Sequence, residues 1–224
     1  APITYRSAIP GWGSVTKVPH GARESTCPRS SSPIGSSTRD NRCSGDRPYL
    51  VGMSESRRSD VGTSAFEPWP AEVEVHVEWG PPGARLAGDR GDLVVIVDVL
   101  AFSTSVATTV ARGGVALSYS GGELEAMGGR EAAAEALGAE IVAKDRAATT
   151  ARFSLSPASL ATIGPGDRLI FTSLNGAACT SAAASAPAVL VGGLTNRSAV
   201  ADAVFDLLQR GVAKRCTIVA CGER

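Results

Sequence analysis

The chain has little histidine and no excess of charge of either sign. Only two histidines occur among its 224 residues, His20 and His76. A histidine-based zinc site or a Ser-His-Asp triad is therefore hard to build. Lys plus Arg and Asp plus Glu both number 22, so the formal net charge is zero. This balance gives no reason to expect nucleic acid or an anionic membrane as a partner, and it favours a small-molecule substrate.

Long apolar segments and paired cysteines are also missing. No apolar run reaches the roughly 18 residues that a membrane-spanning helix needs. The first residues, Ala1-Pro2-Ile3, lack the basic-then-apolar order of a secretory signal. We therefore expect a cytoplasmic protein with no membrane partner and with reduced thiols, since an odd number of cysteines without a C-x-x-C pair disfavours a disulfide framework. The cysteines are Cys27, Cys43, Cys179, Cys216 and Cys221.

Residues 1–71 show no sustained helical or strand period. They mix Ser, Arg, Gly and Pro, as in residues 30–37, and this composition is typical of disorder. We therefore expect a disordered extension over residues 1–71 and one domain over residues 72–224. Because Met53 precedes a leader of Ser, Glu and Arg, we also propose that the residues before it lie upstream of the natural start. A native N-terminus at Met53 in mass spectrometry would support this, and an earlier one would refute it.

From Glu72 onward, strand patterns alternate with helix patterns. Valines alternate with Glu and His over residues 73–78, which predicts a half-buried strand at a sheet edge. Pro81-Pro82-Gly83 then breaks the chain, and the β-branched run 93–97 is typical of a central strand covered on both faces. The further expected elements are a helix near 103–112, a strand at 115–120, a helix near 123–137, a strand at 140–144, a short helix from Ser156-Pro157, a strand at 168–172, an alanine-rich helix after Gly176, a strand at 189–191, a helix closing at Gly211 and a strand at 216–220.

This βα repeat predicts the α/β fold class, with a largely parallel sheet and helices on both faces. Right-handed crossovers would bring the carboxyl ends of the strands to one edge, where ligands bind. The chain stops at Arg224 directly after a strand, so we expect the domain to be incomplete at its C-terminus.

Polar residues or glycine follow four of the expected strands. Because the carboxyl ends of parallel strands share an edge, these residues should face one crevice. The four clusters are Asp98 with Ser103 and Thr104, then Thr172-Ser173-Leu174-Asn175-Gly176, then Thr195-Asn196, then Cys221-Gly222-Glu223.

Asp98 closes the apolar run of the central strand. A carboxylate there is costly to bury without a partner, and a hard divalent ion such as Mg²⁺ would compensate the charge. The alternative is that Asp98 only caps the turn that follows.

The other candidates also have two interpretations. Ser103 and Thr104 lie at an expected helix start, where free backbone N–H groups favour phosphate, although an ordinary cap would look the same. Asn175-Gly176 tolerates positive φ and can aim N–H groups at an anion, but the pair is common in tight turns. Asn196 is either a ligand or the cap of the next helix, and the pattern slightly favours the cap.

Four segments of the chain together carry a more specific motif. They are Val94–Ser105 (VVIVDVLAFSTS), Ser173–Gly176 (SLNG), Val191–Ala201 (VGGLTNRSAVA) and Ile218–Arg224 (IVACGER). In order and spacing this set resembles the 2-phosphosulfolactate phosphatase family, and the resemblance covers about residues 73–224.

The resemblance implies a Mg²⁺-dependent phosphatase that converts 2-phosphosulfolactate to sulfolactate and phosphate, a step of coenzyme M biosynthesis. By position it implies catalytic roles for Asp98, Asn175 and Glu223, with Asp98 and Glu223 as metal ligands. The substrate-binding residues that it implies are Ser103, Thr104, Ser173, Gly176 and Asn196.

Three positions depart from the family pattern. The arginine that usually follows the Asp-Val-Leu triplet is Ala101, so one positive charge for a phosphate or sulfonate is missing. Residues 153–157 lack the aspartate of the corresponding family stretch, and the family's later acidic segment has no counterpart before Arg224. The alternative hypothesis is therefore a divergent or inactive homologue that binds phosphate or another small anion.

If the chain is a phosphatase, water is the simplest nucleophile. No cysteine has an arginine six residues later, and Leu100 stands where an aspartyl-phosphate mechanism would need a second carboxylate. No G-x-G-x-x-G or Walker sequence supports nucleotide binding. The sequence leaves open whether the chain forms a homo-oligomer.

Overall fold

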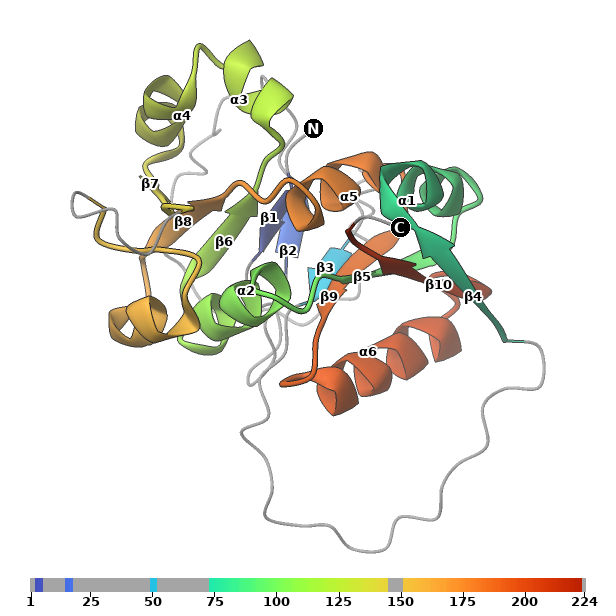
Figure 1. Cartoon of the computed structure of the whole chain (residues 1–224). Helices are drawn as coiled ribbons and strands as arrows, with labels where there is room; N and C mark the ends of the chain where they lie inside the picture. Colours follow the sequence, from blue (N-terminus) through green and yellow to red (C-terminus); the bar gives the residue numbers. More distant parts are fainter. Residues whose placement is uncertain (1–2, 6–14, 18–48, 52–72, 145–150, 223–224) are drawn as a thin grey trace, which may run out of the picture.

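The structure is a computed structural model of the whole chain, shown in Figure 1. The residues that it describes are 3–5, 15–17, 49–51, 73–144 and 151–222. Within residues 1–71 it describes three short strands, which the sequence analysis does not predict: β1 (Ile3–Tyr5), β2 (Val15–Lys17) and β3 (Tyr49–Val51). The rest of the extension predicted to be disordered, and the hypothesis of a start at Met53, lie outside the described residues.

The remaining elements confirm the predicted alternation of strands and helices, with shifts of a few residues at their ends. The strands are β4 (Glu74–Trp79), β5 (Leu93–Val97), β6 (Val115–Ser118), β7 (Glu140–Ile141), β8 (Arg168–Phe171), β9 (Ala188–Gly192) and β10 (Arg215–Ala220). The helices are α1 (Gly80–Asp89), α2 (Phe102–Ala111), α3 (Gly121–Ala126), α4 (Arg130–Leu137), the 3₁₀ helix η1 (Pro157–Thr162), α5 (Gly176–Ala182) and α6 (Arg197–Gln209). No helix in the described part of the chain is both long and apolar enough to span a bilayer.

The strands form one sheet in the order β4-β10-β5-β9-β3-β2-β1-β6-β8-β7. The four strands β4, β10, β5 and β9 run parallel, and so do β6, β8 and β7. Among the described strands, the antiparallel pairs all include β1 or β2. The α/β class and the largely parallel sheet are therefore confirmed, with β4 at one edge and β5 in the interior as predicted.

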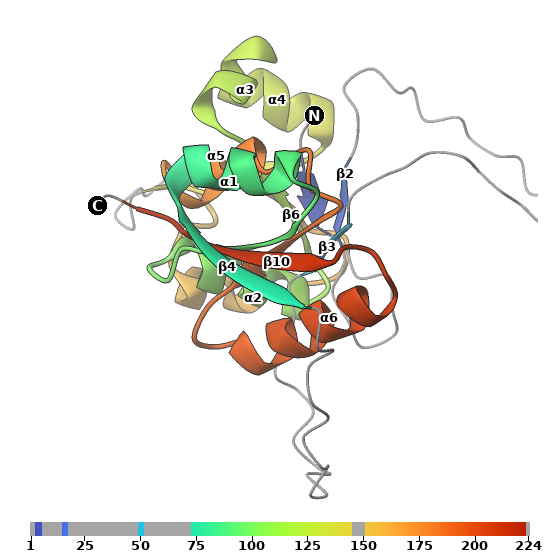
Figure 2. The ribbon, with the colours of Figure 1, turned by 90° about the vertical axis from the view of Figure 1, so that its right-hand side faces the viewer.

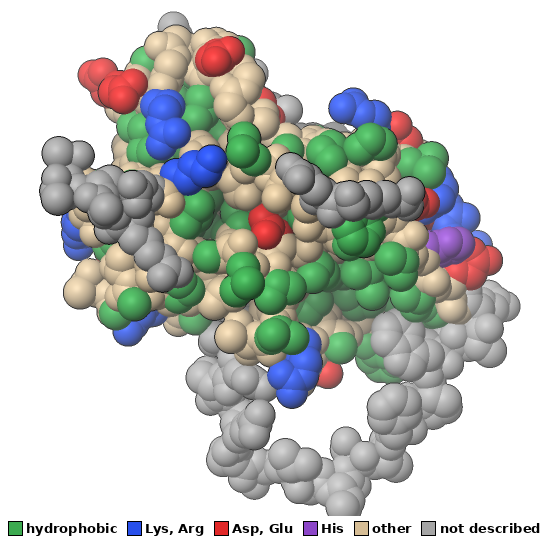
Figure 3. Space-filling view, in the orientation of Figure 1, with side chains coloured by type: hydrophobic (Ala, Val, Ile, Leu, Met, Phe, Trp, Pro, Cys, Tyr) green, Lys and Arg blue, Asp and Glu red, His purple; other side chains and the backbone are tan. Residues whose placement is uncertain are grey.

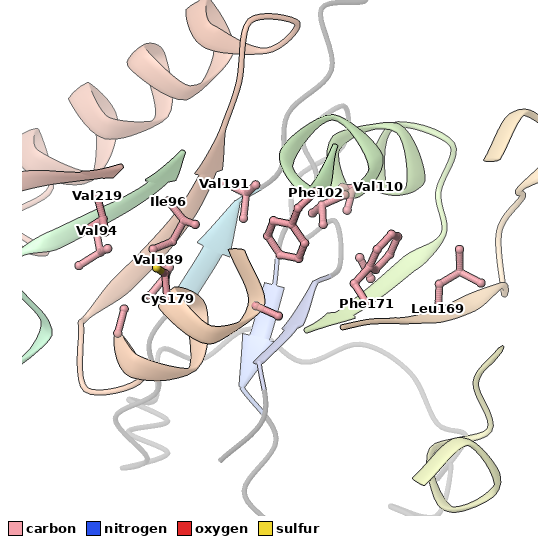
Figure 4. Close-up of a cluster of buried hydrophobic side chains, with 14 of the residues drawn as sticks. Val94, Ile96, Phe102, Val110, Leu169, Phe171, Cys179, Val189, Val191 and Val219 are labelled. Atoms are coloured by element: carbon pink, nitrogen blue, oxygen red, sulfur yellow. The ribbon is translucent and has the colours of Figure 1, made fainter. Parts of the chain in front are cut away.

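Helices cover both faces of the sheet. Figure 2 shows α1 and α5 side by side above β4 and β10, with α6 below them. The apolar face of α6 packs on β5, β9 and β10, while α3 and α4 cover β6 and β8. The largest buried cluster extends from Val219 of β10 to Leu169 of β8, with side chains of α2 and α5 between them (Figure 4). Phe102 of α2 meets Phe171 of β8 edge to face at its centre, with ring centroids 6.3 Å apart.

The burial of the two faces of the edge strand β4 differs from the prediction. The strand is half-buried as predicted, but its valine face is the open one, with Val75 and Val77 54% and 71% exposed. The polar face lies under α1, because Gly83 lets the helix approach so closely that a Cβ there would lie 2.7 Å from Cβ of Glu78. Arg90 then pairs with the Glu78 carboxylate at 3.4 Å. An ion pair under a helix can thus replace the apolar contact that alternation suggests.

Two predictions about helices are wrong. Pro81-Pro82-Gly83 does not break the chain but lies in α1, because the first-turn N–H groups of a helix have no intrahelical acceptor and proline loses nothing there. The single helix expected near 123–137 is two helices, because Gly128 and Gly129 adopt φ values of +91° and +104° between α3 and α4.

A buried ion-pair network around Asp92 lies at the opposite edge of the sheet, where β5 and β10 begin. This carboxylate is fully buried and accepts hydrogen bonds from Nε of Arg215 at 2.7 Å, Oγ1 of Thr217 at 2.8 Å and Nε of Arg90 at 3.0 Å. Burial alone would raise its pKa, but the three hydrogen bonds together hold the pKa of Asp92 below its ordinary value. The network joins β10 to the start of β5 and is structural.

We expect Asp92→Ala to lower the free energy of unfolding by about 3 kcal/mol, because it leaves two arginines without their buried partner. Urea unfolding at neutral pH measures this loss, with Asp206→Ala as a control that breaks only an exposed pair with Arg210. A depressed pKa stabilises the fold above the unfolded-state pKa, and the effect is lost as the pH falls through the folded-state value. The difference between wild type and variant should therefore shrink in strong acid, and an equal difference at all pH values would contradict this account.

Candidate functional site

Asp98 lies directly after β5 and is held by the loop that follows β8. Its side chain is 7% exposed. Oδ2 accepts hydrogen bonds from the backbone N–H of Gly176 at 2.9 Å and from the Ser173 hydroxyl at 3.1 Å. Its other oxygen, Oδ1, accepts no hydrogen bond from any described residue. The structure therefore brings the predicted Asp98, Ser173 and Gly176 together, with one carboxylate oxygen anchored and one left over.

The start of α2 folds back onto Asp98. The Ser103 hydroxyl accepts a hydrogen bond from the Asp98 N–H at 3.0 Å, and the Ser103 N–H donates to the Asp98 carbonyl oxygen at 3.0 Å. Ser103 is fully buried, so it positions the loop rather than capping the helix, whose cap position is Ala101. The N–H groups of Phe102 and Thr104 in the first turn donate to no described residue. Within the described residues, these two donors are therefore unused, as is usual for the first turn of a helix.

Thr104 is the one hydroxyl of this turn with partial exposure. Its Oγ1 lies 3.5 Å from the carbonyl oxygen of Val99, which is a long and weak contact. The side chain therefore keeps donor and acceptor capacity in the first turn of α2.

Gly176 is required for a different reason than the sequence suggests. Both Asn175 and Gly176 tolerate positive φ, but neither uses it: Asn175 has a φ of −102°, and Gly176 is not among the glycines with positive φ. A Cβ at Gly176 would lie 2.3 Å from Cδ1 of Phe102 and 2.7 Å from Oδ2 of Asp98. Its N–H is taken by Asp98 and cannot also face an anion. Asn175 is exposed beside it, with a side chain that makes no cap hydrogen bond to α5.

Asn196 closes the loop after β9. Its amide is almost fully buried, and it accepts from the Gly193 N–H at 2.8 Å and donates to the Val191 carbonyl oxygen at 2.9 Å. It occupies the cap position of α6 but makes no side-chain cap bond. The loop that it shapes puts Gly193 against Ser103, where an added Cβ would lie 3.4 Å from Cβ of Ser103. Asn196 therefore acts on the crevice through the loop's shape.

The end of β10 reaches the same edge. The Cys221 N–H donates to the Val97 carbonyl oxygen at 3.0 Å, and a Cβ on Gly222 would lie 4.0 Å from Nδ2 of Asn175. Cys216 and Cys221 pack into different core clusters, which confirms that they lie on opposite faces. All four predicted strand ends thus meet at one edge of the sheet, around Asp98. Glu223, the other predicted catalytic residue and metal ligand, lies outside the described residues.

The thiols of Cys179 and Cys221 interact beneath this edge, and the interaction lowers the pKa of Cys179 and raises the pKa of Cys221. The Cys221 thiol donates to the carbonyl oxygen of Val219 at 3.7 Å. Cys179 is fully buried in the middle of α5. Because neither thiol projects as a free nucleophile, water remains the simplest attacking group.

The rim of the crevice is apolar. The leucines that follow β5, β8 and β9 are strongly exposed, at 92%, 77% and 68%: Leu100, Leu174 and Leu194. Figure 3 shows hydrophobic side chains gathered over the middle of this face, in front of the strand ends.

Burial raises the pKa of Asp98 above its ordinary value, and the hydrogen bonds from Ser173 and Gly176 offset part of that rise. An ionised Asp98 therefore costs free energy in the absence of a cation. A carboxylate whose pKa is shifted by burial is a candidate functional group.

The described residues offer a limited set of ligands for a metal ion. No group of three or more His, Cys, Asp and Glu side chains among them could hold one. Asp98 supplies one carboxylate oxygen that accepts no hydrogen bond from a described residue. Mg²⁺ is commonly held by one or two carboxylates, with phosphate oxygens and waters completing its shell. The site fits an ion completed by substrate, and it does not fit a closed protein cage.

Two contacts at the site were missed by sequence reasoning. Phe102 closes on Gly176, and Gly193 closes on Ser103. An aromatic residue and a glycine carry no chemical signal of their own. A signal did exist in the Gly192-Gly193 pair directly after a buried strand, since glycine there marks a close approach of backbone.

The family model described as 2-phosphosulpholactate phosphatase matches residues 83–224, which is more than half of the chain. The chain belongs to this family. The matched span includes all four strand ends of the crevice, so the 2-phosphosulfolactate phosphatase family shares the part of the fold that carries Asp98. No curated protein and no solved structure matches the chain. Membership of this phosphatase family supports a hydrolase activity on a small-molecule substrate.

Proposed function

We propose that the chain hydrolyses 2-phosphosulfolactate to sulfolactate and inorganic phosphate. The observation that carries the proposal is the position of Asp98. Its Oδ2 accepts two hydrogen bonds, its Oδ1 accepts none from a described residue, and it lies next to the first turn of α2, where two N–H groups have no described acceptor. Membership of the family supplies the reaction class.

The start of α2 is suited to the phosphate group. Its first-turn N–H groups carry the positive end of the helix macrodipole, and the N–H groups of Phe102 and Thr104 have no described acceptor. In the transition state, negative charge spreads over the equatorial oxygens of the transferring phosphoryl group. Fixed donors at this position would stabilise that charge without reorganisation.

The reaction needs no covalent intermediate on the protein. The oxygen of a water molecule forms a bond to phosphorus as the bond from phosphorus to the ester oxygen breaks. The leaving oxygen takes up a proton, and the products are the alcohol and phosphate. The roles that we propose for Asp98 and the Asn175 side chain are to orient that water, since Asp98 is held by Ser173 and the Asn175 side chain makes no cap bond to α5.

Mg²⁺ is the ion that we propose for this site. Asp98 and Glu223 would be its protein ligands, of which Asp98 is among the described residues. When bound, it would neutralise phosphate oxygens and act as a Lewis acid. It would also offset the unfavourable charge of a buried Asp98.

Phosphate release from a panel of phosphomonoesters tests both the reaction and the metal. We expect turnover of 2-phosphosulfolactate in Mg²⁺, a loss of at least about 10²-fold after chelation, and recovery when Mg²⁺ is restored, because the ion supplies transition-state charge stabilisation. Activity that survives chelation would contradict the role of Mg²⁺. Absence of turnover on every ester, with phosphate still bound, would instead favour the alternative of a small-anion-binding homologue.

A further inference from the structure

Arg130 lies beside the loop after β8, although it belongs to a separate part of the fold. It is the first residue of α4, and its Nη1 lies 3.5 Å from Oγ1 of Thr172. Thr172 directly precedes Ser173, whose hydroxyl donates to Asp98. The guanidinium therefore lies along the same loop that anchors the Asp98 carboxylate. Figure 3 shows basic side chains over the region of α4 and β8, next to the apolar middle of this face.

Neither an ion pair nor helix stability accounts for an arginine at this position. No described carboxylate lies within ion-pair distance of Arg130, whereas the arginines that do form ion pairs are Arg90, Arg152, Arg210 and Arg215. A cation in the first turn of a helix opposes the macrodipole, at a cost of about 0.3–1 kcal/mol. One long contact to a hydroxyl leaves most of the five guanidinium N–H donors of this exposed side chain available.

The first turn of α2 and the Arg130 guanidinium belong to different elements of the fold. The first turn of α2 is held against Asp98 through Ser103, and the loop after β8 is held against it through Ser173. A small molecule whose phosphate lies at α2 would extend its remaining groups toward one of the neighbouring loops. At the β8 loop, those groups would meet Arg130.

We propose that Arg130 binds a second anionic group of the substrate, a carboxylate or a sulfonate, and thereby selects phosphomonoesters that carry one. The inference rests on the proposed function and adds its specificity-determining residue. A planar guanidinium is well suited to this role, because it forms two parallel hydrogen bonds to a carboxylate or sulfonate.

The test compares three esters on the wild-type chain and on Arg130→Gln. Two esters carry a second anion, 2-phosphosulfolactate and 2-phosphoglycerate, and glycerol 2-phosphate carries none. For the first two we expect kcat/KM to fall about 10- to 100-fold through a higher KM with little change in kcat, as for loss of a charged hydrogen bond. For glycerol 2-phosphate we expect a change smaller than about twofold. Arg130→Lys should restore part of the loss, because it keeps the charge without the planar fork.

Arg112→Gln is the matched control. Arg112 is also exposed, and it lies at the far end of α2, away from the crevice. All three esters should be turned over by this variant as by wild type. An equal loss on all three esters in Arg130→Gln, or no loss on any of them, would overturn the inference.

A binding measurement distinguishes failure of the Arg130 inference from failure of the proposed function. Sulfolactate carries the second anion but no phosphate, so its binding does not depend on catalysis. We expect it to shift the Arg130 Nε–Hε resonance and the Thr172 amide resonance of the wild-type chain, while glycerol shifts neither. If the chain releases no phosphate but these shifts occur, the proposed function fails and the anion site stands. If phosphate is released and sulfolactate shifts neither resonance, the inference fails alone.

Discussion

Asp98→Asn is expected to reduce phosphate release from 2-phosphosulfolactate by at least about 10²-fold while leaving the protein as stable as wild type or more so. The asparagine oxygen can still accept from Gly176 and Ser173, so the loop contacts survive. What is lost is the negative charge. The two readouts, phosphate release and urea unfolding, are therefore expected to move independently.

The stability part of this prediction follows from the raised pKa of Asp98. A group whose folded-state pKa is raised binds its proton more tightly in the folded protein than in the unfolded chain. As the pH rises above the unfolded-state pKa, ionisation of Asp98 increasingly opposes folding. The neutral asparagine removes that cost at neutral pH, as is common at functional sites.

Asp167→Asn serves as the control, because Asp167 is a loop residue whose carboxylate accepts from the Gly164 N–H outside the crevice. It should leave phosphate release unchanged. A clear loss of stability in Asp98→Asn, or turnover at the wild-type rate, would show that Asp98 is a structural cap and not the centre of the site.

Gly176→Ala is expected to damage both stability and activity. The added methyl would lie 2.3 Å from Cδ1 of Phe102 and 2.7 Å from Oδ2 of Asp98, and neither neighbour is the loose end of a flexible side chain. Overpacking of this kind costs about 1–3 kcal/mol, because the ring and the carboxylate must both move. Displacement of the anchored Asp98 oxygen by even about 1 Å should lower turnover by about 10²-fold.

Gly121→Ala is a close match for this substitution. Gly121 is also the first residue of a helix, and nothing lies within 4 Å of the position that its Cβ would take. This control should unfold at nearly the wild-type urea concentration and retain full turnover. A Gly176→Ala variant that behaves like the control would mean that the loop after β8 is not packed against Asp98.

The sequence was sufficient to predict the fold class and to bring Asp98, Ser173 and Gly176 to one edge of the sheet. Both depend on local patterns: the apolar run that ends at Asp98, and polar residues or glycine after three of the later strands. The rule that parallel strands share a carboxyl edge then brings Ser173 and Gly176 to Asp98, although 75 residues or more separate them.

Features that depend on the exact path of the backbone could not be predicted in this way. The valine face of β4 is open because Gly83 brings α1 down on Glu78, and alternation alone does not reveal which face a helix will cover. Asn196 was predicted as a ligand or a cap, but its amide bonds to the backbone of its own loop, which only the path of that loop determines.

The central claim is that phosphate binds at the first turn of α2, beside Asp98. The most direct test is a titration of the full chain with inorganic phosphate, in the presence of Mg²⁺, followed through the backbone amide resonances. We predict that the largest shifts occur at Phe102 and Thr104, whose N–H groups have no described acceptor. Shifts confined to the opposite edge, around Gly91, or no shifts at saturating phosphate, would contradict the claim.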